Sequence, residues 1–313
     1  MAVRARTLVF LPVLSTRLST RLNRATNSVI TTTSRKCKLL SVRMASSQSA
    51  ATSSLTRSVT VPGLAPVQVV AGPGLSEPDF SNAIDCSLFK QWLKNLQGEK
   101  GILTNERISL RQVQIQGVDM FGSRVGFLKF KADIIDKETG AKIPGIVFSR
   151  GPAVAMLILL ESGGQTYAVL TEQVRVPVGK FILELPAGML DDDQGDFIGT
   201  AVCEVEEETG LKLKVEDMVN LTSFLDHTTG QGVFPSPGGC DEDLKFFLYR
   251  GKVDEETLKM LQGKETGLRD HGELIKVHVV PYNKLWRTTS DAKVLCAIAL
   301  YEMAKKEGIL SNI

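Results

Sequence analysis

The sequence predicts an α/β (α+β) protein in which a mixed β-sheet is sandwiched by helices and preceded by an antiparallel β subdomain. The first observation is an apolar hairpin pattern, in which Val154–Leu160 and Thr166–Thr171 flank a turn with two glycines. The second is helical periodicity downstream, at Phe197–Thr209 and at roughly Ala292–Lys306. Strands and amphipathic helices within one segment bury their apolar faces by stacking in layers.

The first half of the folded chain has a helix signal followed by a strand signal. Apolar residues recur at helical spacing between residues 75 and 100, so we expect one short helix that ends at Gly98. The period then changes to two over Ile108–Ile115 and Val125–Ile134, which predicts strands. Residues 75–150 are therefore expected to form an N-terminal helix and an antiparallel β subdomain.

The second half, residues 151–313, is expected to form one domain. Phe181–Ala187 has a strand-like pattern and leads into the first helix of this domain. Further strands are predicted at Leu221–Leu225, Leu244–Tyr249 and Leu274–Val280. No internal repeat recurs at a fixed period, which argues against a solenoid or propeller.

The N-terminal stretch has the composition of an organelle transit peptide. Residues 1–76 contain ten basic residues, many Ser and Thr, and neither Asp nor Glu. We assign residues 1–60 to a disordered transit peptide and place the boundary of the folded region near Val59 to Glu77. Ser and Thr abundance favours the chloroplast (plastid stroma), and Arg4 and Arg6 leave the mitochondrion as an alternative. A basic tail that binds nucleic acid or a membrane is a third reading.

The charge balance changes once the leader is set aside. Removing those ten residues from the 37 basic ones leaves 27 against 35 acidic residues, a net charge of about −8. Nucleic-acid binding depends on a basic footprint, so we expect none. No apolar run reaches 18 residues, so we expect no membrane span. The five cysteines are scattered without a CxxC pair, which argues against a disulfide framework or a zinc site.

A dense block of carboxylates follows an acidic, glycine-bounded turn that begins at Gly188. On the helix expected to end at Gly210, Glu204, Glu207 and Glu208 stand at i, i+3 and i+4 and share one face. Like charges at this spacing repel, so the face favours a bound cation, although a solvated acidic helix is the simpler alternative. Oxygen ligands suit a hard divalent ion, Mg²⁺ or Mn²⁺.

Together with the strand before it, this segment resembles the signature of the Nudix hydrolase family, which implies the Nudix fold. Gly188 matches the first glycine, the three glutamates match the metal ligands, and Gly210-Leu211 matches its end. The resemblance also implies that the backbone carbonyl of Ala187 is a metal ligand. Two features depart from the signature: Cys203 stands where the family has arginine, and the loop before the helix is one residue longer. We expect Cys203 to be a half-buried thiol rather than a nucleophile.

The flanking segments resemble the ADP-ribose and ADP-sugar diphosphatase group of this family, including the plant plastid enzymes. The similar segments are Glu172–Lys180, Glu184–Gly188 and Pro235–Glu242. The resemblance implies metal-dependent hydrolysis of ADP-sugars, such as ADP-glucose and ADP-ribose, to AMP and sugar phosphate. The residues expected to bind substrate are Arg175, Glu184, Pro237 and Gly238.

Several single residues have two possible roles. Arg175 is expected to contact a phosphate or the nucleotide, with a surface salt bridge as the other reading. Glu273 or Asp270 is the candidate general base beside the three helix glutamates, although a solvated loop carboxylate is equally consistent. His278 is expected to be structural, and Trp286 is more often a core residue than a base-stacking one.

The resemblance also implies a homodimer formed through residues 75–150. Two other functions fit the sequence. The first is a Nudix diphosphatase that acts on another nucleotide sugar or on NADH. The second is a protein that binds nucleotide sugars and is only weakly active, because Cys203 replaces the motif arginine.

Overall fold

The computed structural model describes residues 55–60, 66–190, 196–267 and 273–312. Most of the predicted transit peptide therefore lies outside the described residues. Strand β1 (Thr56–Val59) pairs antiparallel with β2 (Val67–Ala71), so regular structure is present within the range 1–60, and the extent of the leader stays a prediction. Composition misses this strand because β1, Thr-Arg-Ser-Val, is as basic and hydroxyl-rich as the leader.

The N-terminal sheet has six strands in the order β1-β2-β3-β4-β5, with β6 also paired to β4. The predicted antiparallel pair is confirmed as β3 and β4, and both strands are longer than expected. Strands β2 and β3 run parallel, however, so the subdomain is mixed rather than antiparallel. The bounds are β3 (Ile108–Phe121), β4 (Arg124–Asp136), β5 (Lys142–Ile143) and β6 (Ile146–Ser149).

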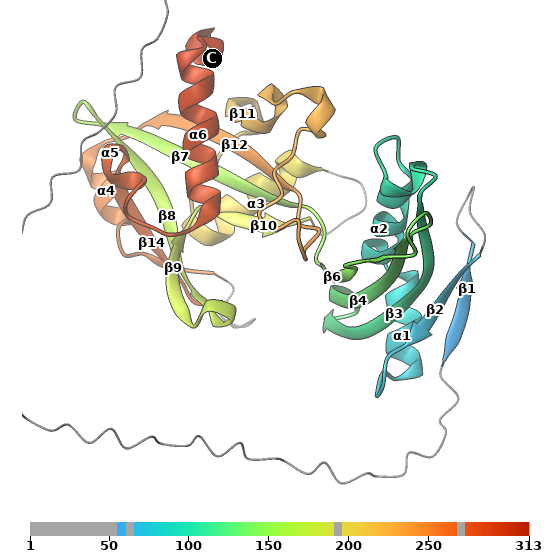
Figure 1. Ribbon diagram of the computed structural model, residues 1–313. Coiled ribbons are helices and arrows are strands. Elements are labelled where there is room, and N and C mark those ends of the chain that lie inside the picture. The colour runs from blue at the N-terminus through green and yellow to red at the C-terminus, as the bar shows by residue number, and fades with distance from the viewer. Residues whose placement is uncertain (1–54, 61–65, 191–195, 268–272, 313) are drawn as a thin grey trace, which may run out of the picture. The chain divides into compact units, whose positions relative to one another are not determined.

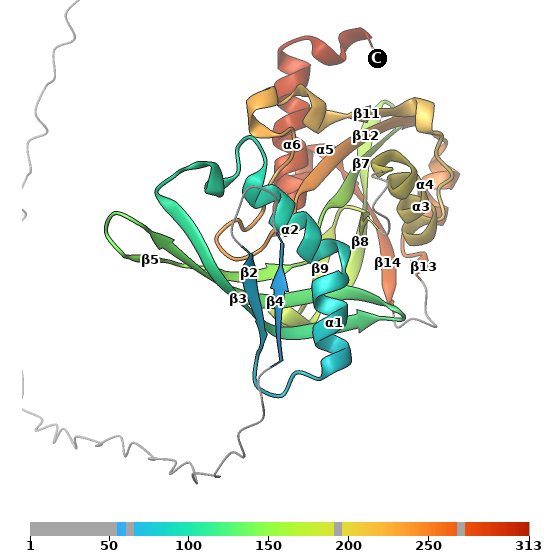
Figure 2. The ribbon, with the colours of Figure 1, turned by 90° about the vertical axis from the view of Figure 1, so that its right-hand side faces the viewer.

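Two helices replace the single helix predicted before this sheet. Helix α1 (Glu77–Asp85) ends and α2 (Ser87–Gln97) begins at Cys86, whose backbone is extended at φ −71° and ψ 156°. Both helices bury apolar side chains, including Phe80 and Phe89, in one cluster against the same sheet, so the apolar pattern continues across the break. Figure 2 shows α1 and α2 on this sheet.

The C-terminal sheet has eight strands in the order β11-β12-β7-β8-β14-β13, with β10 paired to β7 and β9 to β8. The predicted hairpin is confirmed as β7 and β8, and the pairing of β12 with β7 is parallel, so the sheet is mixed. The bounds are β7 (Ala153–Ser162), β8 (Gln165–Arg175), β9 (Lys180–Glu184), β10 (Ala187–Met189), β11 (Met218–Asn220), β12 (Leu244–Lys252), β13 (Glu265–Thr266) and β14 (Ile275–Pro281).

Helices cover both faces of this sheet, as predicted (Figure 1). Alternate side chains of a strand point to opposite faces, and β7 buries both sets. Leu157 and the alternate residues on its face pack with α6 (Ala292–Lys306). Met156 and the alternate residues on the opposite face pack with α3 (Phe197–Thr209) and α4 (Glu255–Leu261). Both α3 and α6 have the bounds that the sequence predicts.

Two strand predictions in this half need correction. Leu221–Phe224 forms a 3₁₀ helix, η4, whose N-cap Asn220 accepts a hydrogen bond from the Ser223 amide at 3.1 Å. The predicted strand Phe181–Ala187 is divided into β9 and β10, because Pro186 between them has no N–H to donate. The shorter helices are η1 (Ile102–Thr104), η2 (Val176–Val178), η3 (Val215–Asp217), η5 (His227–Thr229), α5 (Tyr282–Leu285) and η7 (Ile309–Asn312). Among the described residues, no helix has the length and apolar character needed to cross a membrane.

Candidate active site

Helix α3 is held in place by its two ends. The Asp196 side chain accepts a hydrogen bond from the Gly199 amide at 2.9 Å and caps the N-terminus. Gly210 ends the helix at φ 74°, a left-handed conformation that glycine adopts without a steric penalty. Ala201 and Val205 are buried against the sheet, so the orientation of the helix about its axis is fixed.

This orientation brings Glu208 and Glu204 together beside the sheet. Glu208 is only 6% exposed, and its carboxylate accepts hydrogen bonds from Gln173 Nε2 at 2.6 Å and from the Ala187 amide at 3.2 Å. Burial, and then the charge of Glu204, raises the pKa of Glu208 to about 8. A Cβ on Gly188 would overlap the Glu204 carboxylate, so β10 passes directly over that side chain.

Glu207 does not join this pair. Glu207 is about 100° around the helix axis from Glu208, so it lies at the edge of the same face and is not buried with Glu208. Its side chain is exposed. Across the described parts of the chain, no three His, Cys, Asp or Glu side chains form a group that could hold a metal ion. Glu204 and Glu208 therefore lie together in this structure, and the role of Glu207 as a third metal ligand stays a prediction.

The donor set of the pair fits a hard divalent cation. Both groups are carboxylates, one of them is buried, and the charge of Glu204 disfavours ionisation of Glu208. A divalent ion between them would offset this repulsion, whereas the Gln173 and Ala187 donors satisfy only part of the charge of Glu208. The role of the Ala187 carbonyl as a ligand stays a prediction.

The chain that leads into residues 268–272 is anchored to the C-terminal end of α3. Thr266 Oγ1 donates to the Glu208 carbonyl at 2.5 Å, and the Gly267 amide donates to the Glu207 carbonyl at 3.4 Å. Asp270 lies outside the described residues. Glu273 follows them, is exposed, and lies against Gly267. Its role as the general base remains a prediction, and these contacts place it near the end of the acidic helix.

Arg175 is held by Glu184 in a two-point ion pair. Arg175 Nε lies 2.6 Å from Glu184 Oε1, and Arg175 Nη2 lies 3.0 Å from Glu184 Oε2. Glu184 Oε2 also accepts from Lys293 Nζ at 2.7 Å. Burial alone would raise the pKa of Glu184, but the bonds from Arg175 and Lys293 lower it below its usual value. Glu184 is 3% exposed and supports Arg175, and its contact with substrate stays a prediction.

Comparison with known proteins identifies the family of the chain. A family profile described as NUDIX domain matches residues 149–298. The chloroplastic Nudix hydrolase 14 of Arabidopsis thaliana is 67% identical over 266 residues, which cover 84% of this chain and 86% of that protein. The chain belongs to the Nudix hydrolase family.

More distant relatives match less than half of the chain. An ADP-ribose pyrophosphatase of Haemophilus influenzae is 32% identical over 140 residues, 42% of this chain and 56% of that protein. An ADP-ribose pyrophosphatase of Bacillus subtilis is 29% identical over 149 residues, 48% of this chain and 68% of that protein. A solved structure described as an ADP compounds hydrolase is 14% identical, covers 64% of this chain and 98% of that one, and has a TM-score of 0.41.

The remaining site predictions of the Nudix domain fall on surface turns. Pro237 and Gly238 lie in an exposed turn in which the Gly239 amide donates to the Ser236 carbonyl at 3.2 Å. The Gly239 carbonyl accepts from the Phe148 amide at 2.8 Å, which ties this turn to β6. Contact of Pro237 and Gly238 with substrate stays a prediction.

Three side chains need separate comment. Cys203 is exposed rather than half-buried, because it lies on the outer side of α3. Trp286 is 61% exposed, so the expectation that it belongs to the core is wrong. His278 Nε2 lies 2.9 Å from Glu172 Oε2 on the neighbouring strand, in agreement with a structural role.

Two residues that the sequence interpretation did not select contact the site. Gln173 donates to Glu208, and Lys293 donates to Glu184. The period of two along β8 places Gln173 on the same face as Arg175, which is the signal that could have identified it. Lys293 carries no comparable signal, because its partner is 109 residues away in the chain.

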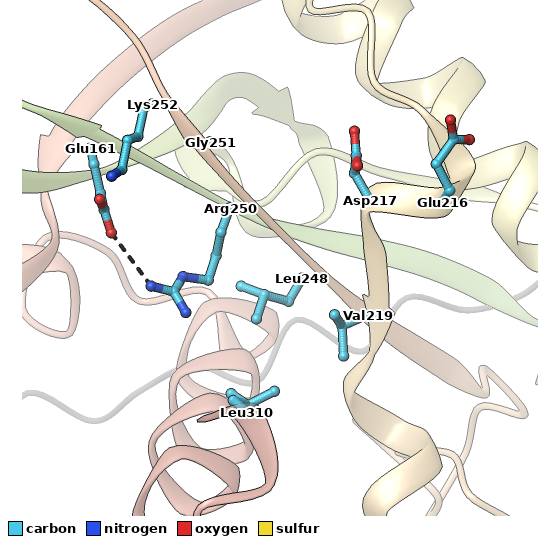
Figure 3. A pocket seen from close by; sticks show the side chains of 9 residues that line it. All are labelled: Glu161, Glu216, Asp217, Val219, Leu248, Arg250, Gly251, Lys252 and Leu310. Atoms are coloured by element: carbon cyan, nitrogen blue, oxygen red, sulfur yellow. Dashed lines mark hydrogen bonds and ion pairs between the residues drawn. The ribbon is translucent and has the colours of Figure 1, made fainter. Parts of the chain in front are cut away.

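A cavity of about 430 Å³ lies elsewhere in the Nudix domain (Figure 3). Glu161 and Arg250, 3.4 Å apart, stand on one side of it, with Asp217 and Glu216 on the other. Glu161 is at the far end of β7 from Ala155, the partner of Ala187, which is about 20 Å along the strand. None of the predicted site residues lines this cavity.

Replacing Gly188 tests the close passage of β10 over Glu204. In Gly188→Ala we expect the free energy of unfolding to fall by about 1–3 kcal/mol, because the added Cβ displaces the Glu204 carboxylate. We also expect Mg²⁺ to raise the Tm less than in the wild type. Chemical denaturation with and without Mg²⁺ measures both quantities. Gly117→Ala is the control, since a Cβ there meets open space. Equal losses in both variants would contradict the geometry.

The raised pKa of Glu208 predicts a pH-dependent response to metal. Glu208 takes up a proton on folding, so the metal-free protein loses stability as pH rises from the unfolded value of 4.5 through about 8. A cation must displace that proton, so Mg²⁺ should raise the Tm more at about pH 8.5 than at about pH 6.5. Thermal unfolding with chelator or Mg²⁺ measures this difference. Glu208→Gln should abolish it, and a pH-independent increase in both proteins would refute the assignment.

Proposed function

We propose that this Nudix hydrolase cleaves the pyrophosphate bond of ADP-sugars, such as ADP-glucose and ADP-ribose, to AMP and sugar phosphate, with Mg²⁺ or Mn²⁺. The observation that carries the proposal is the pairing of Glu208 with Glu204 close to a cationic side chain. Gln173, which donates to Glu208, and Arg175 are two residues apart on β8 and share one face, so the guanidinium lies on the same side of the sheet as the carboxylate pair. A cation site beside a fixed guanidinium suits a substrate with two adjacent phosphoryl groups.

The residues divide the chemistry between them. Glu204 and Glu208 would hold the divalent ion, which supplies charge neutralisation when bound and is generally used by Nudix hydrolases. Arg175 keeps guanidinium N–H groups beyond the two that Glu184 takes, and these can bind a phosphate oxygen. Glu273 or Asp270 would accept a proton from the attacking water. The water oxygen bonds to phosphorus as the bond to the bridging oxygen breaks, which releases AMP and the sugar phosphate.

The relatives support the substrate class and the location. Two of them are named ADP-ribose pyrophosphatases, which motivates an ADP-linked substrate. The Arabidopsis relative is named chloroplastic. The acid-free, hydroxyl-rich leader supports the same compartment, so we propose that the protein functions in the chloroplast.

Product analysis tests the activity. The protein without residues 1–54 is incubated with ADP-glucose, ADP-ribose, UDP-glucose or NADH, with Mg²⁺, with Mn²⁺ or with chelator. We expect chelator-sensitive release of AMP and sugar phosphate from the two ADP-sugars, and slower cleavage of the other two compounds. Glu204→Gln and Glu208→Gln should each lower kcat/KM by about 100-fold or more, because each removes a carboxylate from the cation site.

Glu206→Gln is the matched control, because Glu206 lies on the same helix and forms an exposed ion pair with Lys212 at 3.2 Å. Its kcat/KM should stay within about twofold of the wild type. Wild-type rates in Glu204→Gln and Glu208→Gln at saturating Mg²⁺ would refute the site. Preferred cleavage of UDP-glucose or NADH would instead correct the substrate class.

We also propose that the N-terminal subdomain forms a homodimer. Helices α1 and α2 cover one face of its sheet, to which Leu128 and Phe130 of β4 point. Phe127 alternates with these residues along β4 and therefore points to the other face. Phe127 contacts Phe121 and Phe148, with ring centroids 5.0 and 5.2 Å away. Ile146 is 62% exposed on the same face. Exposed apolar side chains that gather on one face, here beside Lys129 and Lys131, are typical of a protein interface.

Light scattering after size-exclusion chromatography tests the dimer. The wild type should have the mass of two chains, and Phe148→Asp should shift it toward one chain, because burying a carboxylate in an apolar interface is unfavourable. Met260→Asp is the control, since Met260 is 66% exposed on α4 in the other domain. A monomeric wild type would rule the dimer out.

A further inference from the structure

Lys293 occupies a fixed position between two carboxylates. Its Nζ lies 2.7 Å from Glu184 Oε2 and 3.2 Å from Asp291 Oδ1. The side chains are 19% exposed for Lys293, 4% for Glu184 and 9% for Asp291, so the ion pairs are shielded from water. Buried pairs with good geometry depend on each partner, because removing one leaves an uncompensated charge.

The backbone around Lys293 is also held. Asp291 caps α6 by accepting a hydrogen bond from the Lys293 amide at 3.1 Å. Thr289 Oγ1 accepts from the Asp291 amide at 3.0 Å and donates to the Leu183 carbonyl at 2.5 Å. The start of α6 is thereby attached to β9 at the residue before Glu184.

Lys293 comes from the opposite helix layer to the carboxylate site. Thr171 and Glu184 are paired across β8 and β9, and they share the sheet face of Val169, which packs with α3. Helix α6 packs on the other face, with Leu183 and Leu185. Lys293 of α6 therefore contacts a carboxylate that belongs to the α3 face of the sheet. Arg175, Glu184 and Lys293 form one chain of contacts from the α6 layer to the site.

We propose that Lys293 is a positioning residue that acts on the substrate through Glu184 and Arg175. Lys293 fixes Glu184 Oε2, Glu184 holds the Nε and Nη2 edge of Arg175, and the other edge of the guanidinium is presented to a phosphate. Two cations share the Glu184 carboxylate, so Arg175 is not fully neutralised by it. The inference rests on the proposed hydrolysis of a nucleoside diphosphate derivative, and it assigns a role to a residue outside the acidic helix.

Lys293→Met tests the role. With ADP-ribose and ADP-glucose we expect KM to rise about tenfold, with a smaller change in kcat, because Arg175 loses its fixed orientation for binding. Calorimetric titration with α,β-methylene-ADP, a non-hydrolysable nucleoside diphosphate, should show a similar increase in Kd. Lys293→Arg keeps the charge and should stay within about threefold of the wild type in both measurements. Lys306→Met, an exposed position on the same helix, should change neither.

A double-mutant cycle separates positioning from direct contact. If Lys293 acts through Glu184, Lys293→Met should add less than about twofold to the Kd of Glu184→Gln. A full tenfold addition would show that Lys293 contacts the ligand itself and would overturn the proposal. An unchanged Kd in a folded Lys293→Met protein would also overturn it. If the methionine variant does not fold, Lys293→Gln replaces it, since glutamine keeps a donor for Glu184 but carries no charge. We expect the same increase in Kd for that variant.

The outcomes also distinguish the two proposals. A wild type that binds α,β-methylene-ADP but cleaves no ADP-sugar would refute the proposed function, and loss of that binding in Lys293→Met would still support the positioning role. A wild type that cleaves ADP-sugars, with KM and Kd unchanged in Lys293→Met, would refute the positioning role alone. A wild type that neither binds nor cleaves would refute both.

Discussion

The buried carboxylate of Glu208 is the constraint on which the rest of the site depends. A carboxylate with 6% exposure is unfavourable unless its oxygens are satisfied, and here one accepts from Gln173 and the other from the Ala187 amide. These two donors come from β8 and β10, so α3 can pack on the sheet in only one rotation and one register. The same packing sets Glu204 under Gly188, where a side chain on the strand would not fit.

The ionised carboxylate of Glu208 has a cost in stability, which indicates that the site needs its charge. A raised pKa means that the folded protein disfavours the ionised form, so the carboxylate reduces stability at neutral pH without a compensating cation. An apolar side chain would pack there at less cost. Such a group is typical of a site whose function needs the charge, and the pairing with Glu204 makes a divalent cation the ligand that relieves it most directly.

The sequence predicts the secondary structure around the site well and its long-range contacts poorly. Helix α3 has the predicted bounds because Gly210 ends it and because its apolar residues repeat with the helical period. The break at Cys86 is invisible because α1 and α2 face the same sheet, so the apolar period continues across it. The strand predicted at Leu221–Leu225 fails because the Asn220 cap favours a 3₁₀ turn over the local β propensity.

The same distinction holds within the site. The i and i+4 spacing of Glu204 and Glu208 is a local property and predicts their proximity, whereas the position of Glu207 depends on which side of α3 faces the sheet. Glu184 and Lys293 show the limit more clearly: two charged residues far apart in the chain carry no periodic signal that they pair. Only the folded topology attaches the start of α6 to β9, where Thr289 donates to the Leu183 carbonyl. Because Glu184 joins Lys293 of one helix layer to Arg175 beside the other, the packing of α6 bears on the orientation of Arg175.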